Sequence, residues 1–280
     1  AASRMVKQLA LACNTKQRTL LACERLTVNS PRVRRFAAVS RYVIDQLVEH
    51  YTIMPRRIVR IPNAVSIESA TPQQATETRN TLRENLQIGA DQTVFLFPAM
   101  NAALKGWNEL LDALQRVVRQ NPRVMVIAAM PVRYRTQQAI GEMGLADHVC
   151  YIGTTKNIDA LYLASDLTVL PTWYDPSSKV VLESLAHGKP AISTRFNGAS
   201  DWILNPSGDD VRPQIRPHDA PGGAVIDSPS DIDALAEVMI RLCDPQRREQ
   251  CHAALQSLDP RLNMDRHVET LEALLREVAD

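Results

Sequence analysis

The sequence predicts an α/β fold built on a doubly wound parallel sheet, and three features support this. Short runs rich in Val, Leu and Ile, apolar on both faces, recur along the chain, as buried parallel strands require. Segments with helical periodicity alternate with these runs from residue 93 onward. The composition fits a globular protein, because 45% of the residues are hydrophobic and 22% are charged, so a sizeable core can form.

The expected elements follow one another in regular alternation. Strands are expected at 93–98, 124–129, 149–152, 167–170, 191–193 and 224–226. Helices are expected at 107–119, 135–143, 158–164, 177–186 and 231–243. Because crossovers between parallel strands are right-handed, this order gives a doubly wound sheet. In such sheets, ligands lie at the carboxyl ends of the strands.

The first 65 residues are expected to form a separate unit. Helical periodicity runs over 5–28 and 40–50, with Ser40 as a plausible N-cap of the second helix. A short strand is expected at 57–61, which reads Arg-Ile-Val-Arg-Ile and is ended by a Pro-Asn pair.

A polar stretch divides this unit from the rest of the chain. Residues 66–80 have almost nothing to bury, so we expect a linker or an exposed loop there. The large domain then covers 81–262. The tail 263–280 contains an amphipathic helix at 266–278, and we expect it to pack back on residues 5–50.

Charge is divided unevenly along the chain. Residues 1–62 hold twelve Lys and Arg but only three Asp and Glu, although the whole chain has a formal net charge of +1. This segment is expected to face something anionic, such as a membrane surface or a phosphorylated acceptor. The alternative is a solvated helical face. Nucleic acid is not expected as a partner, because the segment lacks interleaved aromatic residues and any DNA-binding motif.

The sequence also suggests where the protein works. No apolar run is long enough to cross a bilayer, and the chain starts with neither Met nor a signal-peptide pattern. We therefore expect a cytoplasmic protein, with peripheral contact at the inner face of the membrane, whose true N-terminus is missing. The five cysteines form no CxxC pair and have no zinc spacing, so we expect reduced thiols.

The stretch 170–197 carries the clearest chemical signal. A buried strand runs into a loop that ends at Asp175, and Pro176 stands where a helix would begin. The first amides of that helix, at Ser177, Ser178 and Lys179, are expected to be free donors at the positive end of a helix dipole. This arrangement predicts an anion site.

Two carboxylates flank the predicted anion site. Glu183 follows Asp175 by eight residues, a rise of roughly 12 Å along a helix. A diphosphate at the helix start would leave one carboxylate near a sugar on one side and the other near a ribose. Carboxylates suit both positions, because they accept paired hydrogen bonds from vicinal hydroxyls.

This stretch resembles the E-x7-E signature of family 4 retaining glycosyltransferases, present here as Asp175-x7-Glu183. The end of the family's acceptor domain is similar to SRYVIDQLVEHYTIMPRRIVRIPNAV, and its phosphate loop to FPAMNAALKGWNELLDAL. The core of its donor domain is similar to YIGTTKNIDALYLASDLTVLPTWYDPSSKVVLESLAHGKPAISTRFNGASDWI. The resemblance covers nearly the whole chain, and is closest to lipopolysaccharide-core and cell-envelope glucosyltransferases.

The resemblance implies a fold of the GT-B type. Its donor domain is a Rossmann-like, doubly wound parallel sheet, here 81–262. Residues 1–65 would be the remnant of a first, Rossmann-like acceptor domain. The acceptor-side residues would then lie upstream of residue 1, so this chain alone would bind nucleotide but turn over poorly or not at all.

The resemblance also assigns roles to single residues. Lys105 would contact the donor diphosphate, Glu183 the ribose hydroxyls and Asp175 the hydroxyls of the transferred sugar, and these three would be the catalytic set. The other implied donor-binding positions are Met130, Gly153 and Thr154 beside the base, and Ser177, Ser178, Lys179 and Val180 around the phosphate or sugar.

Three departures from the family pattern matter. The first carboxylate is Asp175 rather than Glu, one methylene shorter, which affects sugar contact or donor choice. An Arg that commonly precedes the phosphate-binding Lys has no counterpart, so phosphate neutralisation would depend on Lys105 and the helix dipole. Small Gly-x-Gly-like residues after the second strand are replaced by Ala128, Ala129 and Met130.

The implied reaction is transfer of a hexose from a nucleoside diphosphate sugar, expected to be a UDP-sugar, to an acceptor hydroxyl on a glycan or lipid-linked acceptor. Retention of configuration, and a role in cell-envelope or lipopolysaccharide synthesis, follow from the resemblance. No cofactor and no essential metal are expected. One Asp-x-Asp occurs, at Asp231 and Asp233, but it opens a predicted helix and is interpreted as an N-cap with a first-turn acid.

Other interpretations stay open. The chain could be an epimerase acting on sugar nucleotides with the same architecture, or a degenerate module that binds nucleotide sugar without catalysis. A nicotinamide oxidoreductase is disfavoured, because no GxGxxG follows any predicted strand. Among single residues, His187 is expected to be a packed histidine rather than a catalyst. Trp173 and Tyr174 could stack on a sugar or pack on the domain edge.

Overall fold

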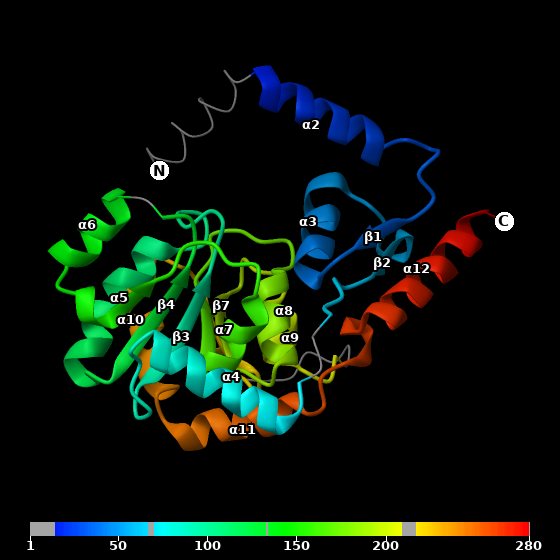
Figure 1. The fold of residues 1–280 in the computed structure, drawn as a ribbon. Helices are drawn as coiled ribbons and strands as arrows, with labels where there is room; N and C mark the ends of the chain where they lie inside the picture. The colour runs from blue at the N-terminus through cyan, green and yellow to red at the C-terminus, as the bar shows by residue number, and fades with distance from the viewer. Residues whose placement is uncertain (1–14, 67–69, 133, 209–216, 280) are drawn as a thin grey trace.

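A computed structural model describes residues 15–66, 70–132, 134–208 and 217–279. Its larger body is a six-stranded sheet in the order β5-β4-β3-β6-β7-β8, with every neighbouring pair parallel (Figure 1). The strands are β3 (Thr93–Pro98), β4 (Val124–Ala129), β5 (Val149–Tyr151), β6 (Leu167–Leu170), β7 (Ala191–Thr194) and β8 (Gly223–Ile226). All six predicted strands are confirmed, with ends that differ by at most one residue.

The strand order is that of a doubly wound sheet. The chain runs outward from β3 to β4 and β5, then returns to place β6 beside β3, and continues to β7 and β8. The winding therefore reverses between β3 and β6, which pair through Phe95 with Leu167 and Leu96 with Thr168. In open α/β sheets, this switch point, at the carboxyl ends of the strands, is where ligands bind.

Both faces of the sheet are buried, because alternate residues of each strand are apolar on both sides. In β3, Phe95 and Phe97 pack in one core cluster, while Val94 and Leu96 pack in another. Helices α5 (Trp107–Gln120) and α10 (Ile232–Arg241) contact each other and contribute to the first cluster. Helices α4 (Pro72–Asn85) and α7 (Ile158–Ala164) contact each other and cover the second.

Four further helices complete the large body: α6 (Tyr134–Glu142), α8 (Lys179–Ala186), α9 (Ser200–Leu204) and α11 (Pro245–Leu255). Short 3-10 turns occur at Pro55–Arg57, Ala146–His148, Pro217–Asp219 and Pro260–Leu262. The five predicted helices of this domain are confirmed, with shifted ends. α8 begins two residues later than expected, and α9 and α11 were not predicted.

The structure corrects the linker predicted at 66–80, because helix α4 begins within it at Pro72. Thr71 caps it: its hydroxyl accepts from the Gln74 amide at 3.2 Å, and the Gln74 side chain accepts from the Thr71 amide at 2.9 Å. Arginines help to anchor this polar helix to the domain: Arg79, for example, pairs with Asp166 at 2.6 Å. Apolar periodicity is therefore weak, although the capping box was present in the sequence.

The first segment forms a smaller parallel unit. β1 (Phe36–Ala38), α3 (Arg41–Tyr51) and β2 (Ile58–Arg60) make one βαβ crossover, preceded by α2 (Thr15–Val28). Ser40 caps α3 as predicted, accepting from the Val43 amide at 3.2 Å. Residues 5–14 of the predicted first helix lie outside the described residues. A βαβ unit is what an acceptor-domain remnant would contain, and that assignment stays a prediction.

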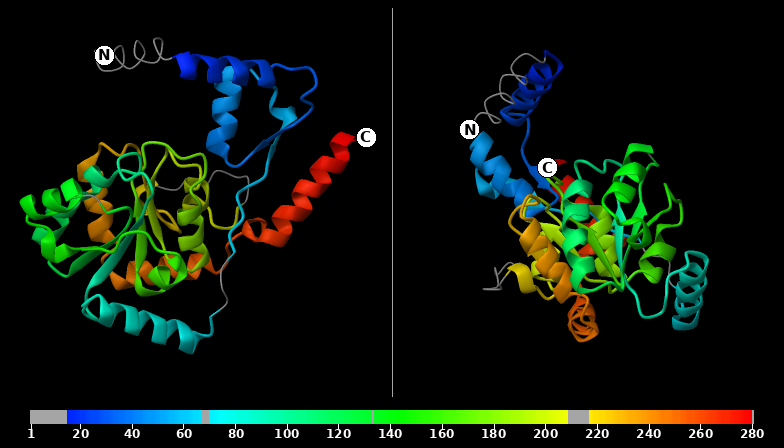
Figure 2. Two further views of the ribbon diagram at one scale, coloured as in Figure 1. Left: turned by 45° about the horizontal axis from the view of Figure 1, so that its top comes forward. Right: turned by 90° about the vertical axis from the view of Figure 1, so that its left-hand side faces the viewer.

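The C-terminal helix α12 (Met264–Ala279) lies against the first segment (Figure 2). Arg34 donates to the Val278 carbonyl oxygen at 2.7 Å, and Arg35 forms an ion pair with Glu277. At the other end of the helix, His267 Nδ1 lies 2.8 Å from the Pro62 carbonyl oxygen. The prediction that the tail packs back on the first segment is confirmed by these contacts.

The expectations of reduced thiols and of no membrane-spanning segment can be compared with the described residues. The four cysteines described, Cys23, Cys150, Cys243 and Cys251, carry free thiols, and Cys13 lies outside the described ranges. None of the helices in these ranges combines the length and the apolar character that crossing a bilayer would need.

Candidate functional site

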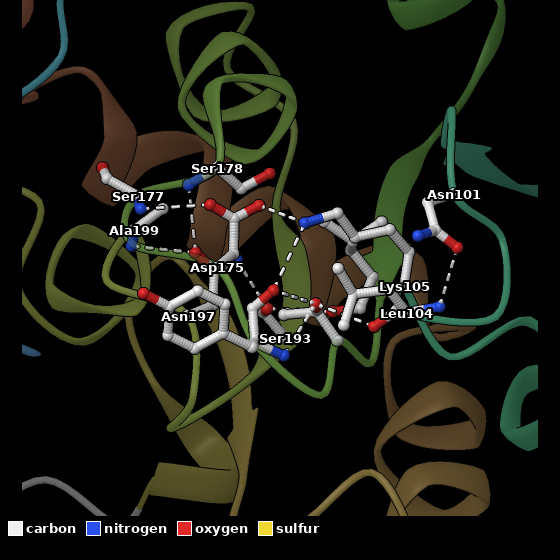
Figure 3. A network of polar contacts seen from close by, with 12 residues as sticks. Asn101, Leu104, Lys105, Asp175, Ser177, Ser178, Ser193, Asn197 and Ala199 are labelled. Carbon is white, nitrogen blue, oxygen red and sulfur yellow. Dashed lines mark hydrogen bonds and ion pairs between the residues drawn. The ribbon is translucent and has the colours of Figure 1, made fainter. Parts of the chain in front are cut away.

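Two residues predicted for the site meet at the switch point of the sheet. Lys105 follows β3, Asp175 follows β6, and these strands are the neighbours between which the winding reverses. Lys105 Nζ lies 2.6 Å from Asp175 Oδ2, with the two side chains 20% and 14% exposed (Figure 3). The sheet therefore places a cation and a carboxylate, 70 residues apart in the chain, where its ligands are expected.

Backbone contacts hold the loops of these two residues together. The Trp173 amide donates to the Leu104 carbonyl oxygen at 2.9 Å, and the Thr172 hydroxyl lies 3.2 Å from the same oxygen. Gly106 has φ +83°, and a Cβ there would lie 2.0 Å from the Pro171 carbonyl oxygen. Only glycine permits this conformation and this approach at low cost, so Gly106 fixes the position of Lys105.

The loop before α8 differs from the prediction. Asp175 Oδ1 accepts from the Ser177 amide at 3.1 Å, and Asn197 Oδ1 accepts from the Ser178 amide, also at 3.1 Å (Figure 3). Neither serine amide is a free donor, which corrects the expectation for both residues. The reason is that α8 begins at Lys179, with Ser178 extended (φ −66°, ψ 115°) as its N-cap.

The free amides lie two residues further along. Among the described residues, no acceptor bonds the backbone N–H groups of Lys179, Val180 and Val181, and the Ser178 side chain does not cap the helix. These groups form the positive end of α8, which is a ready anion site. The Lys179 side chain is exposed and Val180 is half-buried. The unbonded amides therefore lie further along the chain than expected, and their use as an anion site stays a prediction.

Glu183 lies in the second turn of α8 and is half-buried rather than turned fully to solvent. The Tyr162 hydroxyl is 3.0 Å from Glu183 Oε2 and 2.9 Å from the Val180 carbonyl oxygen, so its proton is shared between two acceptors. Burial, then the nearby Glu183 charge, raises the pKa of Tyr162, so this hydroxyl stays a donor. Tyr162 thus orients the Glu183 carboxylate.

His187 is a packed histidine, as predicted. Its side chain is 5% exposed, and its ring lies 4.9 Å from the Tyr162 ring. Nδ1 is 2.8 Å from the Glu183 carbonyl oxygen, and Nε2 is 3.1 Å from Asp159 Oδ1. Both ring nitrogens are therefore used in holding α8 against α7.

The three positions predicted to border the base are placed differently from one another. Met130, the residue after β4, is 1% exposed and its side chain packs in the core, so only its backbone is left to border the base, and that role stays a prediction. Gly153 is buried with φ +78°, and Thr154 is exposed. The Tyr151 hydroxyl donates to the Pro131 carbonyl oxygen at 2.5 Å, which joins the loops after β4 and β5. A hollow of about 140 Å³ lies beside them and includes Asn101 and Trp107.

Trp173 and Tyr174 occupy the domain edge and remain exposed, at 43% and 48%. Trp173 Nε1 donates to Glu109 Oε1 at 3.1 Å. The Tyr174 ring meets the Tyr42 ring edge-on at 6.0 Å. Both side chains therefore contact neighbouring residues at the domain edge while part of each ring remains exposed.

Several residues that organise the site were not predicted. Asn197 is 1% exposed and also accepts from the Ala199 amide at 3.0 Å, while its own amide donates to the Ser193 hydroxyl at 2.9 Å. Ser40 of the first segment donates to the Pro176 carbonyl oxygen at 2.6 Å, and Asn63 donates to that of Ser177 at 2.9 Å. The Asn-Gly pair at 197–198 signalled a turn, but nothing local signalled the contacts of Ser40 and Asn63.

The assembled site combines one lysine, one row of free helix amides and two oriented carboxylates. A cation and helix amides together suit a phosphate-bearing ligand, and the carboxylates suit vicinal hydroxyls. A family profile described as Glycosyl transferases group 1 matches residues 78–256, which contain all of these groups. The chain belongs to this family. The predicted family resemblance is confirmed.

Relatives of this glycosyltransferase family cover most of the chain. It is 25% identical over 249 residues to D-inositol 3-phosphate glycosyltransferase of Geodermatophilus obscurus, which covers 84% of the chain and 50% of that protein. It is 22% identical over 229 residues to lipopolysaccharide glucosyltransferase WaaG of Escherichia coli, which covers 80% of the chain and 57% of that protein. The chain therefore spans about half the length of the curated relatives it matches.

Solved structures of glycosyltransferases share the fold. The crystal structure of WaaG, involved in lipopolysaccharide biosynthesis, matches with a TM-score of 0.72 at 19% identity, covering 92% of this chain and 69% of WaaG. Anabaena HepE, crystallised with UDP and glucose, matches with a TM-score of 0.70 at 18% identity, covering 87% of this chain and 63% of HepE. The predicted α/β fold, with its parallel sheet of the GT-B type, is confirmed.

Proposed function

We propose that this member of the glycosyltransferase family binds a nucleoside diphosphate sugar at the switch point and transfers its hexose to an acceptor hydroxyl. The observation that carries the proposal is the meeting of Lys105 with Asp175 beside the free amides of α8. A cation and a helix start converge there from adjacent strands. That is the arrangement a diphosphate requires.

The diphosphate would be held by groups that act most strongly as it leaves. Negative charge builds on the leaving phosphate oxygens, and preorganised donors aimed at that charge lower the barrier. Lys105 and the N–H groups of Lys179, Val180 and Val181 are the donors in place. We propose that they provide this stabilisation without an essential metal ion.

The carboxylates would hold the two sugars. Asp175 now accepts from both Lys105 and the Ser177 amide, so its oxygens are placed next to the proposed phosphate position. A bound donor would share Lys105 between Asp175 and the phosphate, while Asp175 accepts from hydroxyls of the transferred sugar. Glu183, fixed by Tyr162, would accept from the ribose hydroxyls.

The donor nucleotide, the acceptor and the anomeric outcome are proposals that similar proteins support. HepE was crystallised with UDP and glucose, and WaaG is named a lipopolysaccharide glucosyltransferase. We propose a UDP-sugar as donor and a glycan or lipid-linked acceptor in cell-envelope synthesis, with transfer that retains the anomeric configuration.

Membrane contact through the basic first segment would require side chains that are not already bound within the protein. Arg34, Arg35 and Arg57 are bound within the protein, to α12 and to the Val33 carbonyl oxygen. Lys16 and Arg18 on α2 remain exposed, as does Leu20, which is 59% exposed. We propose that α2 supplies any peripheral contact with anionic lipid, at the cytoplasmic face of the membrane.

The proposal is tested with the full-length protein and a panel of nucleoside diphosphate sugars. The expected result is release of nucleoside diphosphate together with a glycosylated acceptor whose anomeric configuration, measured by NMR, matches that of the donor. Lys105→Met should abolish this release. Nucleotide binding without transfer or hydrolysis of any donor would contradict the proposal and leave a non-catalytic module.

A further inference from the structure

A second hollow lies at the amino ends of the strands, opposite the donor site at their carboxyl ends. Its volume is about 370 Å³, and it is lined by the residue before β6, the turn between α8 and β7, and the first turns of α11. These elements meet at the amino ends of β6 and β7, whereas Lys105 and Asp175 lie at the carboxyl ends. The polar lining residues are Asp166, Lys189, Arg248, Glu249 and His252.

Positive charge outweighs negative charge around this hollow. Arg79 and Arg83 of α4 lie behind it, each paired with Asp166, at 2.6 Å and 3.6 Å. Asp166 also accepts from the Val94 amide at 2.7 Å. Of the two carboxylates that line the hollow, Asp166 is therefore already used by two arginines and a backbone amide, and Glu249 is exposed.

Lys189 lies next to this cluster. Among the described residues, no hydrogen bond or ion pair joins its ammonium group to an acceptor. Burial, and then the charges of Arg79, Arg83 and Arg248, lower the pKa of Lys189 to about 8, against the opposing effect of Asp166. A half-buried cation that other cations surround is costly unless an anion joins it.

The walls of the hollow are shaped by close packing at Gly188. This glycine has φ +68°, and a Cβ there would lie 2.6 Å from His252 Nδ1. The imidazole can therefore lie over the turn, with Nδ1 3.0 Å from the Gly188 carbonyl oxygen. Arg248 is fixed from the other side, where it donates to the Leu242 carbonyl oxygen at 2.8 Å. His252 and Arg248 are thus held in place before any ligand arrives.

We propose that this hollow binds a dianionic phosphate group, either the free ion or a small phosphomonoester, at a site separate from the donor site. Lys189 supplies an ammonium group that no acceptor in the described part of the chain binds, and Arg248 a guanidinium with remaining donors; these are the groups that recognise phosphate oxygens. The volume falls in the range of about 300–1,000 Å³ that small-molecule sites occupy. The proposal does not depend on the glycosyl-transfer reaction.

Calorimetric titration with inorganic phosphate tests this site. Lys189→Met and Arg248→Gln should each weaken phosphate binding at least tenfold, whereas Lys156→Met, at an exposed lysine, should leave it unchanged. Lys105→Met should also leave it unchanged, because that lysine belongs to the donor site. Failure of the phosphate site is therefore distinguishable from failure of the proposed function.

An NMR titration keeps the proposal testable if one variant does not fold. The Lys189 side-chain resonances of the wild-type protein are followed with pH, with and without phosphate. Bound phosphate should raise the pKa of Lys189 above its value in the free protein, because the protonated form gains a partner. An unchanged titration curve at saturating phosphate, or equal phosphate affinity in wild type and Arg248→Gln, would overturn the proposal.

Discussion

The ammonium group of Lys105 lies 2.6 Å from a carboxylate oxygen of Asp175, and the two residues follow adjacent strands at the point where the sheet reverses its winding. The other oxygen of Asp175 accepts from the Ser177 amide. One carboxylate therefore joins the loop after β3 to the loop that leads into α8. Lys105 is therefore connected through Asp175 to the loop that leads into α8.

Lys105→Met should weaken the binding of UDP without affecting the binding of uridine. The loss of one charged hydrogen bond to phosphate costs about 1.5–3 kcal/mol, which is roughly a 10- to 100-fold change in affinity. Calorimetric titration of both ligands measures the difference, and Lys16→Met, at an exposed position on α2, serves as the control. Equal loss of affinity for UDP and uridine would show that Lys105 does not contact the diphosphate.

Glu183→Ala should weaken nucleotide binding by ~1–3 kcal/mol, because the ribose hydroxyls lose a charged acceptor. A panel of UDP, GDP and ADP measures this change and shows which base is preferred. Tyr162→Phe should give a smaller loss of the same kind, since it removes only the hydroxyl that orients Glu183.

The matched control for this pair is Glu84→Ala, at an exposed position on α4. A further titration uses 2′-deoxy-UDP, which lacks one ribose hydroxyl. Glu183→Ala should lower the binding free energy of this ligand by less than it does for UDP. Equal UDP affinities in wild type and Glu183→Ala would remove the ribose assignment.

Gly106→Ala should lower the free energy of unfolding by about 2–4 kcal/mol, because the new Cβ would meet the Pro171 carbonyl oxygen in a left-handed backbone conformation. Gly141→Ala is the control, since no atom lies within 4 Å of its ideal Cβ and it stands in α6. There alanine should stabilise by up to about 1 kcal/mol. Urea unfolding of the two variants measures both changes, and an equal response would contradict the packing described at Gly106.

Lys189→Met should raise stability at neutral pH by about 1–2 kcal/mol in phosphate-free buffer, after allowance for solvent screening. The pKa of Lys189 is lowered from 10.5 to about 8 in the folded chain, so the unfolded chain binds more protons between these values. Below pH 8, both states are protonated and the cost of the buried charge is present in full. Stability of the wild type should therefore rise between pH 8 and 10.5.

Thermal unfolding of wild type and Lys189→Met across this pH range isolates the contribution of the one lysine. The difference in stability between wild type and Lys189→Met should become smaller as the pH rises from 8 to 10.5. A gap that stays constant, or that widens, would show that Lys189 is not a destabilising buried cation.

The sequence predicted the strands well, because each of the runs 93–98, 124–129 and 167–170 is apolar on both faces and had no competing interpretation. It missed α4, whose anchoring contacts include those of Arg79 and Arg83 with Asp166. Periodicity of apolar residues cannot show a helix that is anchored by charge. The capping box at Thr71 and Gln74 was the available signal.

For the site, the sequence placed Lys105, Asp175 and Glu183 in one region but could not show their pairings. The contact of Lys105 with Asp175 depends on two strands becoming neighbours, and the use of the Ser178 amide depends on Asn197 returning from β7. The helix starts two residues later than predicted: Ser178 is its extended N-cap, and the Ser177 and Ser178 amides donate to Asp175 and Asn197. Tertiary contacts of this kind leave no local pattern.

The most direct test of the central claim is a titration of the isotopically labelled protein with UDP, followed by amide NMR. A diphosphate at the switch point should move the amide resonances of Lys179, Val180 and Val181 and the side-chain signals of Lys105, while those of Lys189 and His252 stay unchanged. UDP binding that leaves the first turn of α8 and Lys105 unperturbed would contradict the account.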